Sequence, residues 1–187
     1  MKDFINHFSS LINVSGELEK NLLMKTIQLK VKKGEHLHKA GTICNKTFWV
    51  KTGLLRTYYL KEGKEITDGF AAEGETLTSV HSFMRNKSDQ YYLQAIEKSE
   101  LYALSYSDLM AMFDQFPEME RFGRITMSIH YIKLAERLES YQFNSARDKY
   151  NHFCTTHESI LHRLPLGMVA SYLGISQETL SRIRSEA

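Results

Sequence analysis

Apolar residues recur at two different periods along the chain, and the change between them separates helical from extended segments. Near the N-terminus, Phe4, Phe8 and Ile12 follow helical spacing, and Ser15 can cap a second short helix. From Ile27 the period becomes two, which is typical of strands with one buried face. The pattern therefore predicts two packing helices followed by a β domain.

A series of short alternating segments, with glycine at the turns between them, continues to about residue 104. The run Lys61-Glu62-Gly63-Lys64 predicts a hairpin turn. Strands are expected over residues 27–31, 48–50, 54–60, 65–67, 68–71, 76–80, 91–96 and 101–104. Many short strands separated by glycine-containing turns predict an antiparallel roll or barrel.

Two rows of apolar residues lie along one long helix, which we expect from Glu118 to about Gln142. The first row alternates spacings of four and three, and its members are Met127, Tyr131, Leu134, Leu138 and Tyr141. The second row consists of Phe122, Ile125, Ile129 and Ile132. Because two rows need two partners, we expect the second row to face the roll and the first to face another copy of the chain. The alternative is that both rows are buried within one subunit.

The stretch from Leu166 to Arg184 divides at Gly174 into two short apolar-periodic pieces. Gly174 supplies the backbone freedom for a tight turn, and Ser176 can cap the second piece, a layout typical of a helix-turn-helix. Polar side chains that can bond to base edges lie off the apolar stripe of the second helix, at Gln177, Glu178, Ser181, Arg182 and Ser185. The alternative is a helical hairpin that binds no DNA, in which Glu178 and Arg182 form an ordinary i,i+4 pair.

The second of these helices resembles the recognition helix of the cAMP receptor/fumarate-nitrate regulator (Crp/Fnr) family of bacterial transcription factors. In that family the pattern runs Ser-Arg-Glu-Thr-Val-x-Arg, and the matching residues are Ser176, Glu178, Thr179 and Arg182. Gln177 departs from the pattern, because it stands where Arg is usual. The resemblance implies DNA contacts from Ser176, Gln177, Glu178, Thr179, Ser181, Arg182 and Arg184.

The β segments are similar to the roll of a cyclic-nucleotide-binding domain. Glycines fall where that fold makes its successive turns, at Gly34, Gly41, Gly53 and Gly63. Gly74-Glu75 resembles the pair that opens the phosphate-binding cassette of the family. For each glycine alone, ordinary turn chemistry is the better explanation, so the order of the set carries the resemblance.

The resemblance implies an α+β fold with three parts. Residues 1–116 would form an antiparallel β-roll sensor domain with flanking helices, 117–143 the dimerisation helix, and 144–187 the helix-turn-helix domain. The implied partners are double-stranded DNA with a palindromic site, a second copy of the chain and RNA polymerase. The family often carries a hairpin wing beyond the recognition helix. We expect either that this branch of the family lacks the wing or that the natural chain continues past residue 187.

The cassette departs from the family at the residues that would bind a cyclic phosphate. Family members close the cassette with Arg-Ser-Ala or Arg-Thr-Ala, whereas Asp89-Gln90-Tyr91 occupies that place here. An anionic phosphate in a roll needs a cationic partner, and Asp89 would repel it. Arg85 or Lys87 could substitute if the loop is shifted, which makes Gly74, Glu75 and Arg85 the candidate ligand residues. We expect no response to cAMP or cGMP and no cofactor.

Charge and cysteine content restrict the function further. The chain has 187 residues, 42% of them hydrophobic, and a formal net charge of +2. Because there is no broad basic field, affinity for DNA would depend on a few placed contacts and on pairing two subunits. Cys44 and Cys154 are expected to be reduced thiols, and no apolar run is long enough to cross a membrane, so we expect a cytoplasmic protein.

The histidines and cysteines give no pattern typical of a metal site. His36 and His38 are expected on one face of a strand, and the remaining candidates recur every five residues, at His152, His157 and His162. Neither set has carboxylates or cysteines at ligand spacing, and no cysteine cluster near the N-terminus could hold an iron–sulfur centre. No nucleophile elbow, Walker-type loop or pair of carboxylates in a recognisable setting predicts an enzyme.

Two functional hypotheses remain from the sequence. The first is a dimeric, sequence-specific transcription regulator whose roll senses a signal or supports the dimer. The second is a small-molecule or protein-binding module whose two C-terminal helices bind no DNA. Selection from random duplex DNA distinguishes them, because only the first predicts enrichment of a palindromic motif.

Overall fold

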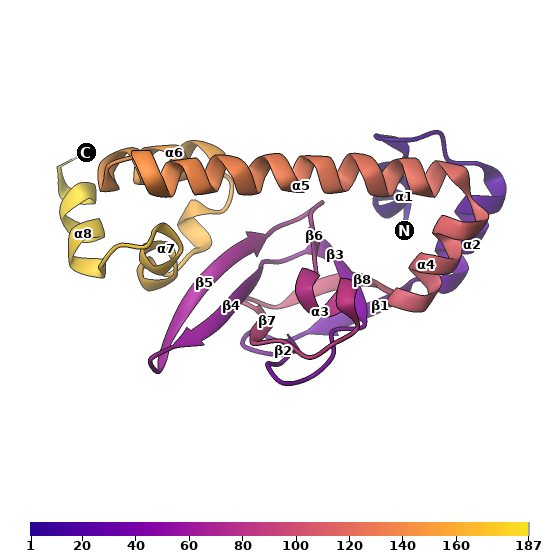
Figure 1. The fold of residues 1–187 in the computed structure, drawn as a ribbon, viewed down its shortest axis with the longest axis horizontal. Coiled ribbons are helices and arrows are strands. Elements are labelled where there is room, and N and C mark those ends of the chain that lie inside the picture. The colour runs from indigo at the N-terminus through magenta and orange to yellow at the C-terminus, as the bar shows by residue number, and fades with distance from the viewer. Residues whose placement is uncertain (187) are drawn as a thin grey trace.

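Two four-stranded antiparallel sheets form a roll beneath one long helix (Figure 1). The computed structural model describes residues 1–186. The first sheet has the order β1-β8-β3-β6 and the second the order β2-β7-β4-β5. The strands are β1 (Ile27–Val31), β2 (His36–His38), β3 (Lys46–Thr52), β4 (Leu55–Lys61), β5 (Lys64–Ala71), β6 (Thr76–Leu77), β7 (Tyr91–Ala95) and β8 (Ser99–Ser105). The predicted antiparallel roll is therefore confirmed.

The hairpin between β4 and β5 has the turn that its sequence predicts. Lys61 pairs with Lys64, and the two residues between them, Glu62 and Gly63, have φ angles of 52° and 75°. Two successive positive φ angles are the signature of a type I′ turn, whose twist matches that of the flanking strands. Gly63 adopts this conformation at little cost, whereas Glu62 is held in it by the hairpin.

The strands predicted over residues 65–67 and 68–71 are a single strand, β5, and the one predicted over residues 76–80 is only partly confirmed, because β6 contains only Thr76 and Leu77. Residues Val80–Arg85 form the short helix α3 instead. Long-range contacts hold it: Phe83 is buried, and the Ser82 hydroxyl accepts a hydrogen bond of 2.8 Å from the Cys44 amide. A six-residue helix fixed by such contacts leaves no clear period in its own sequence.

The helices at one end of the roll enclose an aromatic core. They are α1 (Lys2–Ser9), α2 (Gly16–Lys25) and α4 (Tyr106–Gln115). Phe4 packs edge-on against Phe8 and Trp49, at centroid distances of 5.1 and 5.7 Å. Ser15 and Ser105 cap α2 and α4, since their hydroxyls accept from backbone amides three residues later. The predicted cap at Ser15 is confirmed.

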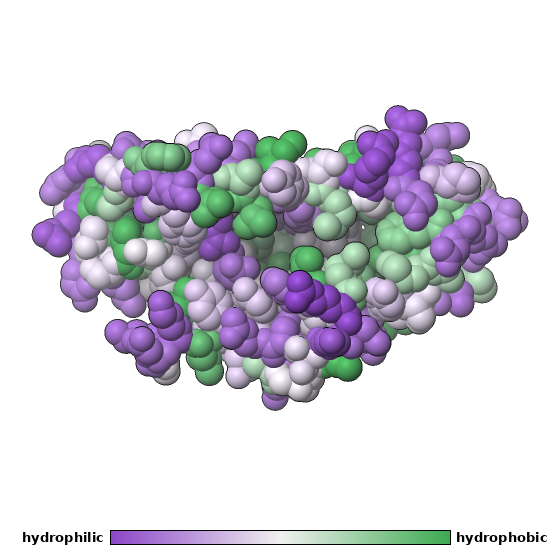
Figure 2. Space-filling model, in the orientation of Figure 1, coloured by the Kyte–Doolittle hydropathy of each residue, from purple (hydrophilic) through white to green (hydrophobic). Residues whose placement is uncertain are grey.

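Helix α5 (Pro117–Phe143) runs the length of the molecule above the roll (Figure 1). Its first apolar row is exposed in the single chain: Leu134 is 62% exposed, and Met127, Tyr131 and Leu138 are also exposed. Figure 2 shows apolar residues among the polar ones along this edge of the molecule. The alternative in which both rows are buried within one subunit is therefore wrong.

The expected burial of the second row against the roll is only partly correct. Phe122 and Ile125 are half-buried, but Ile129 and Ile132 are 41% and 55% exposed. Toward the C-terminal end of α5, polar side chains contact the roll. The Lys133 ammonium lies 3.8 Å from the Glu75 carboxylate, and other contacts join Arg137 to β5.

Four further helical segments follow α5: α6 (Ala146–Thr156), the 3-10 turn η1 (Leu161–Arg163), α7 (Leu166–Leu173) and α8 (Gln177–Ser185). A capping box begins α6, because Ser145 and Asp148 each bond to the backbone amide of the other. Helix α7 lies against β5, where the Ser171 hydroxyl accepts from the Thr67 amide at 3.2 Å. Among residues 1–186, no helix is long and apolar enough to cross a membrane.

Candidate nucleic-acid interface

Helices α7 and α8 meet across a three-residue turn. Gly174 ends α7 with a φ of 68°, and the Ile175 amide donates back to the Ala170 carbonyl at 3.0 Å. This is the arrangement by which a glycine in the left-handed region closes a helix. The Ser176 hydroxyl then accepts from the Thr179 amide at 3.1 Å and caps α8. The turn and both caps agree with the sequence prediction.

The two helices share a small apolar core with α6. It contains Phe153, Val169, Ala170, Leu173 and Leu180. Burying Leu180 and Ile183 fixes the rotation of α8 about its axis. The opposite face of α8 is therefore held toward solvent.

Most of the predicted DNA-contacting residues are exposed, and Glu178, Ser181 and Arg182 lie on that face. The exposed ones are Ser176, Gln177, Glu178, Ser181, Arg182 and Arg184. Thr179 differs, because it is half-buried and its hydroxyl lies 3.1 Å from that of Ser176. In Figure 1, α8 lies at the end of the molecule farthest from α1 and α2, with no strand of the roll in front of it.

Gln177 has a structural contact that its sequence position does not reveal. Its side chain lies against Gly167 of α7, so closely that a Cβ at residue 167 would come within 2.7 Å of the Gln177 amide nitrogen. Gly167 thus permits the close approach of the start of α8 to the start of α7. Gln177 stays exposed, but one side of it packs against protein.

Local hydrogen bonds keep Glu178 ionised at the start of α8. Its own backbone amide, the Ser176 hydroxyl and the nearby Arg182 lower the pKa of the carboxyl below its ordinary value, the backbone bond most strongly. An anion at a helix N-terminus is also favoured by the helix dipole. A carboxylate held in this state can accept from the amino group of cytosine.

Two arginines that the sequence analysis did not single out fix this helical unit to the rest of the chain. Arg163 of η1 binds Glu73 and Glu97 of the roll, with N–O distances of 2.9 and 2.6 Å. Arg137 of α5 bonds to the carbonyl and carboxylate of Asp68 and lies over the Tyr172 ring, 4.4 Å from its centroid. These partners are 35 or more residues distant in sequence, so no local pattern could have identified them.

Tyr141 also differs from its predicted role in the first apolar row. Its hydroxyl donates to the carbonyl of Tyr172 near the end of α7 and accepts from Arg137 at 3.1 Å. The Tyr141 ring lies close enough to Gly174 that a Cβ there would meet it at 3.3 Å. Tyr141 therefore supports the turn between α7 and α8, unlike the other four members of the row.

The three candidate ligand residues of the cassette do not converge. The Gly74 amide donates to the Val50 carbonyl at 2.9 Å, and the Glu75 carboxylate accepts from the Ala72 amide at 3.0 Å. The first bond joins the turn before β6 to β3, and the second is internal to that turn. Arg85 lies at the far end of α3 and is exposed.

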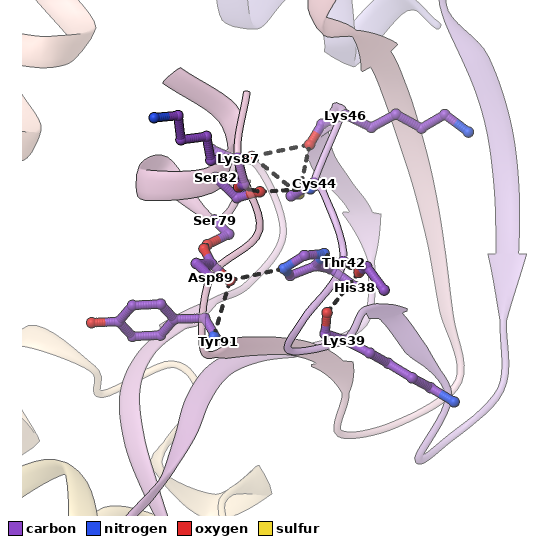
Figure 3. Close-up of polar contacts among 11 residues, drawn as sticks. His38, Lys39, Thr42, Cys44, Lys46, Ser79, Ser82, Lys87, Asp89 and Tyr91 are labelled. Atoms are coloured by element: carbon purple, nitrogen blue, oxygen red, sulfur yellow. Dashed lines mark hydrogen bonds and ion pairs between the residues drawn. The ribbon is translucent and has the colours of Figure 1, made fainter. Parts of the chain in front are cut away.

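Asp89 is turned toward His38, beside Ser79 and Tyr91 (Figure 3). Its carboxylate is 3.1 Å from Nε2 of His38, accepts from the Tyr91 amide at 3.0 Å and is bonded to the Ser79 hydroxyl. Burial alone would raise the pKa of Asp89, but the hydrogen bonds from Ser79, His38 and Tyr91 outweigh it and leave the pKa lowered. A largely buried carboxylate with three hydrogen-bond partners thus occupies this part of the chain.

The expectation that His36 and His38 share one face of β2 is wrong. His36 is opposite Gln94 and His38 is opposite Leu93, so two steps along β2 match one step along β7. Such a bulge breaks the alternation of faces. Nε2 of His36 lies 2.9 Å from the Tyr58 hydroxyl, whereas His38 is buried beside Asp89. In the described part of the chain, no three His, Cys, Asp or Glu side chains are placed to hold a metal ion.

Comparison with known proteins agrees with this architecture. Residues 28–116 match the family described as the cyclic nucleotide-binding domain. The electron transport regulator A of Shewanella oneidensis is 24% identical over 168 residues, and the anaerobic regulatory protein of Pasteurella multocida is 24% identical over 166. Each alignment covers 82% of this chain, which spans 65% and 60% of the length of these two relatives. Both relatives are named as regulators rather than enzymes.

Solved structures extend the likeness to the whole fold. FixK2 of Bradyrhizobium japonicum has a TM-score of 0.75 at 18% identity, with 86% of this chain and 83% of that one covered. A transcriptional regulator of the Crp/Fnr family from Eubacterium rectale has a TM-score of 0.73 at 20% identity, covering 92% and 82%. Residues 28–116 of this chain therefore belong to the cyclic nucleotide-binding domain family, within a fold shared with Crp/Fnr regulators.

Proposed function

We propose that this chain is a homodimeric, sequence-specific DNA-binding regulator of transcription of the Crp/Fnr type, acting in the cytoplasm. In this proposal α7 and α8 form a helix-turn-helix, and α8 enters the major groove. The observation that carries it is the exposed polar face of α8, which is fixed in rotation by the buried Leu180 and Ile183. Recognition helices read bases with residues of this kind near their N-terminus.

The charge of the protein requires that binding be concentrated in a few contacts. A formal net charge of +2 gives little nonspecific attraction to phosphates. Arg182 can make a bidentate contact with guanine, and Glu178 can accept from cytosine. One unit offers too few such contacts for strong binding, so two units are needed.

The exposed row on α5 supports pairing of two chains. Met127, Tyr131, Leu134 and Leu138 repeat at the spacing of a coiled-coil seam and remain exposed in the single chain. Two copies of α5 packed along this row would carry their α8 helices to two half-sites. Dimers of this kind read half-sites about 34 Å apart, or one helical turn of DNA.

We further propose that the protein does not respond to cAMP or cGMP through the cassette. The largely buried Asp89 carboxylate supports this, because the sequence resemblance aligns Asp89-Gln90-Tyr91 with the Arg triplet of the family. An uncompensated anion brought into the roll beside it would cost several kcal/mol. Arg85 offers no compensation from its exposed position on α3.

Selection from random duplex DNA tests the central proposal. The full chain should enrich a palindromic motif, and a Glu178→Ala, Arg182→Ala double variant should fail to enrich it. Retention that falls with salt and enriches no motif would overturn the proposal. That result would favour the alternative of a small-molecule or protein-binding module. Circular dichroism of the double variant provides the control for folding, since both residues are exposed.

A further inference from the structure

A pocket with a volume of about 420 Å³ opens between β1 and β2, away from the candidate ligand residues of the cassette. Each of these strands lies at the edge of its own sheet, and the two are not hydrogen-bonded to each other. The loop from Lys39 to Asn45 forms the remaining wall of the pocket. The volume falls in the range of pockets that hold small molecules, about 300–1,000 Å³. Neither Gly74, Glu75 nor Arg85 lines it.

The floor of this pocket is apolar. Val31 and Phe48 are buried members of the roll core, and Leu29 and Leu37 pack against them. Water on such a floor makes few hydrogen bonds, so an apolar group that displaces it is stabilised by about 25 cal/mol per Å² of apolar surface buried. The floor therefore favours a hydrocarbon body in a ligand.

The rim of the pocket is cationic. Lys30, Lys39 and Lys46 line it, and Glu35 is the acidic residue among its walls. Lys30 is 3.5 Å from the Glu100 carboxylate, whereas neither Lys39 nor Lys46 forms an ion pair within residues 1–186. Two ammonium groups without a carboxylate partner, above an apolar floor, favour an anionic head group.

The wall between the pocket and the cassette is held in place by hydrogen bonds (Figure 3). His38 bonds to Thr42 on the pocket side, at 3.2 Å, and to Asp89 on the other side. Cys44 is fixed through its amide to Ser82 of α3. Figure 3 shows the Lys39 and Lys46 side chains extending to one side of this wall and Lys87 to the other. The His38 ring thus separates an anion in the pocket from the Asp89 carboxylate.

We propose that this pocket binds a small organic anion with an apolar body, such as a medium-chain or aromatic carboxylate. The hydrocarbon part lies on Leu29, Val31 and Phe48, and the carboxylate lies at the rim that Lys39 and Lys46 line. Inorganic phosphate would leave the floor in water, and a neutral hydrocarbon would leave the two ammonium groups without a partner. The site is independent of DNA binding by α8.

Titration of the full chain with octanoate, followed by amide chemical shifts in NMR spectra, tests this proposal. Octanoate should bind saturably and shift the amides of residues 29–31, 37–39 and 42–48. Octanol lacks the carboxylate and acetate lacks the long hydrocarbon chain, so each should bind at least about tenfold more weakly than octanoate. A Lys39→Gln, Lys46→Gln double variant should weaken octanoate binding by about tenfold or more, whereas the matched Lys87→Gln variant should not.

Three results would overturn the inference. Octanol could bind as tightly as octanoate, which would show that the lysines do not select an anion. Octanoate could shift the amides of α5 instead, which would place it on the exposed apolar row. The double variant could bind as the parent does. Because Lys39 is exposed and Lys46 half-buried on the rim, the variants should fold, and their amide spectra check this directly.

Discussion

Both carboxylate oxygens of Glu73 are bonded to the Arg163 guanidinium, at 2.9 and 3.0 Å, across a separation of 90 residues in sequence. Glu73 also accepts from the Gly53 amide at 2.7 Å, and Arg163 reaches Glu97 as well. This bidentate pair fixes the turn before α7 to the roll. The position of α8 relative to the roll therefore depends on an ionised carboxylate.

Acid should weaken this connection. The bond from Arg163 is the largest cause that lowers the pKa of Glu73 from 4.5 to about 2. Because the folded pKa is below the unfolded one, the ionised carboxylate stabilises the fold above pH 4.5, and this contribution is lost as the pH falls toward 2. The Glu73 side chain is 44% exposed, so after screening we expect about 1 kcal/mol.

Urea unfolding at pH 5 and at pH 3 measures this effect. The wild-type chain should lose more free energy of unfolding between the two values than the Glu73→Gln variant. Glu158→Gln, which changes an exposed carboxylate in the same C-terminal region, should behave as the wild type. Equal losses in all three proteins would contradict the role of Glu73.

Replacing Arg182 should weaken specific DNA binding. Arg182 is exposed one turn after Glu178 on the outer face of α8, so Arg182→Ala should cost about 1–3 kcal/mol for the selected site and relax one base position. Glu178→Ala should relax a neighbouring position. Fluorescence anisotropy with a panel of single-base variants measures both, and Arg121→Ala, on an exposed part of α5, is the control. Parental binding by both α8 variants would show that another element reads the bases.

A charge in the apolar row of α5 should separate the subunits. Leu134→Glu places a carboxylate on the proposed seam, which costs several kcal/mol if the seam is desolvated. Sedimentation equilibrium should then detect monomers, and specific DNA binding should be lost. Leu60→Glu makes the same change at the β4–β5 hairpin, where Leu60 is 51% exposed, and should leave the dimer intact. A folded Leu134→Glu protein that remained dimeric would place the interface elsewhere.

Calorimetric titration with cAMP and cGMP at millimolar concentration should detect no micromolar binding. The reason is the largely buried Asp89 carboxylate, beside which an uncompensated anion would be costly. Micromolar affinity for either nucleotide, lost in the Arg85→Ala variant, would reverse this conclusion. It would mean that the loop after α3 moves to bring Arg85 to the phosphate.

Two glycines at turns should differ in their tolerance of alanine. Gly53 has a φ of 106°, and a Cβ there would lie 2.1 Å from the Ser99 hydroxyl and 2.7 Å from its Cα. Gly63 also has a positive φ but has open space around it. Gly63→Ala should cost about 1–2 kcal/mol from conformation alone, and Gly53→Ala about 1–3 kcal/mol more from overpacking. Similar urea midpoints for the two variants would contradict this account.

Much of the fold could be predicted because its signals are local. The alternation from Ile27, the Glu62-Gly63 turn and the helical cap at Ser176 each depend on neighbouring residues, and the structure has all three. The length of α5 was likewise visible from its two apolar rows. Patterns of this kind are set by backbone geometry and by which face is buried.

The errors occur where distant segments decide the outcome. Helix α3 depends on Cys44 and on the burial of Phe83, and the bulge at His36 and His38 depends on the register with β7. The proposed DNA-reading face could be identified from α8 alone. Its attachment through Arg137 and Arg163 could not, because one sequence contains no information on which carboxylates will lie beside an arginine.

The exposed apolar row of α5 also affects how the stability of this protein should be measured. If association covers Met127, Tyr131, Leu134 and Leu138, unfolding and dissociation are one equilibrium, and mass action makes the thermal midpoint rise with protein concentration. The midpoint of the Leu134→Glu variant should then be independent of concentration. Lowering the protein concentration in a cell would then favour the unfolded chain, as heating does. The amount of protein synthesised would thus affect the fraction that is folded.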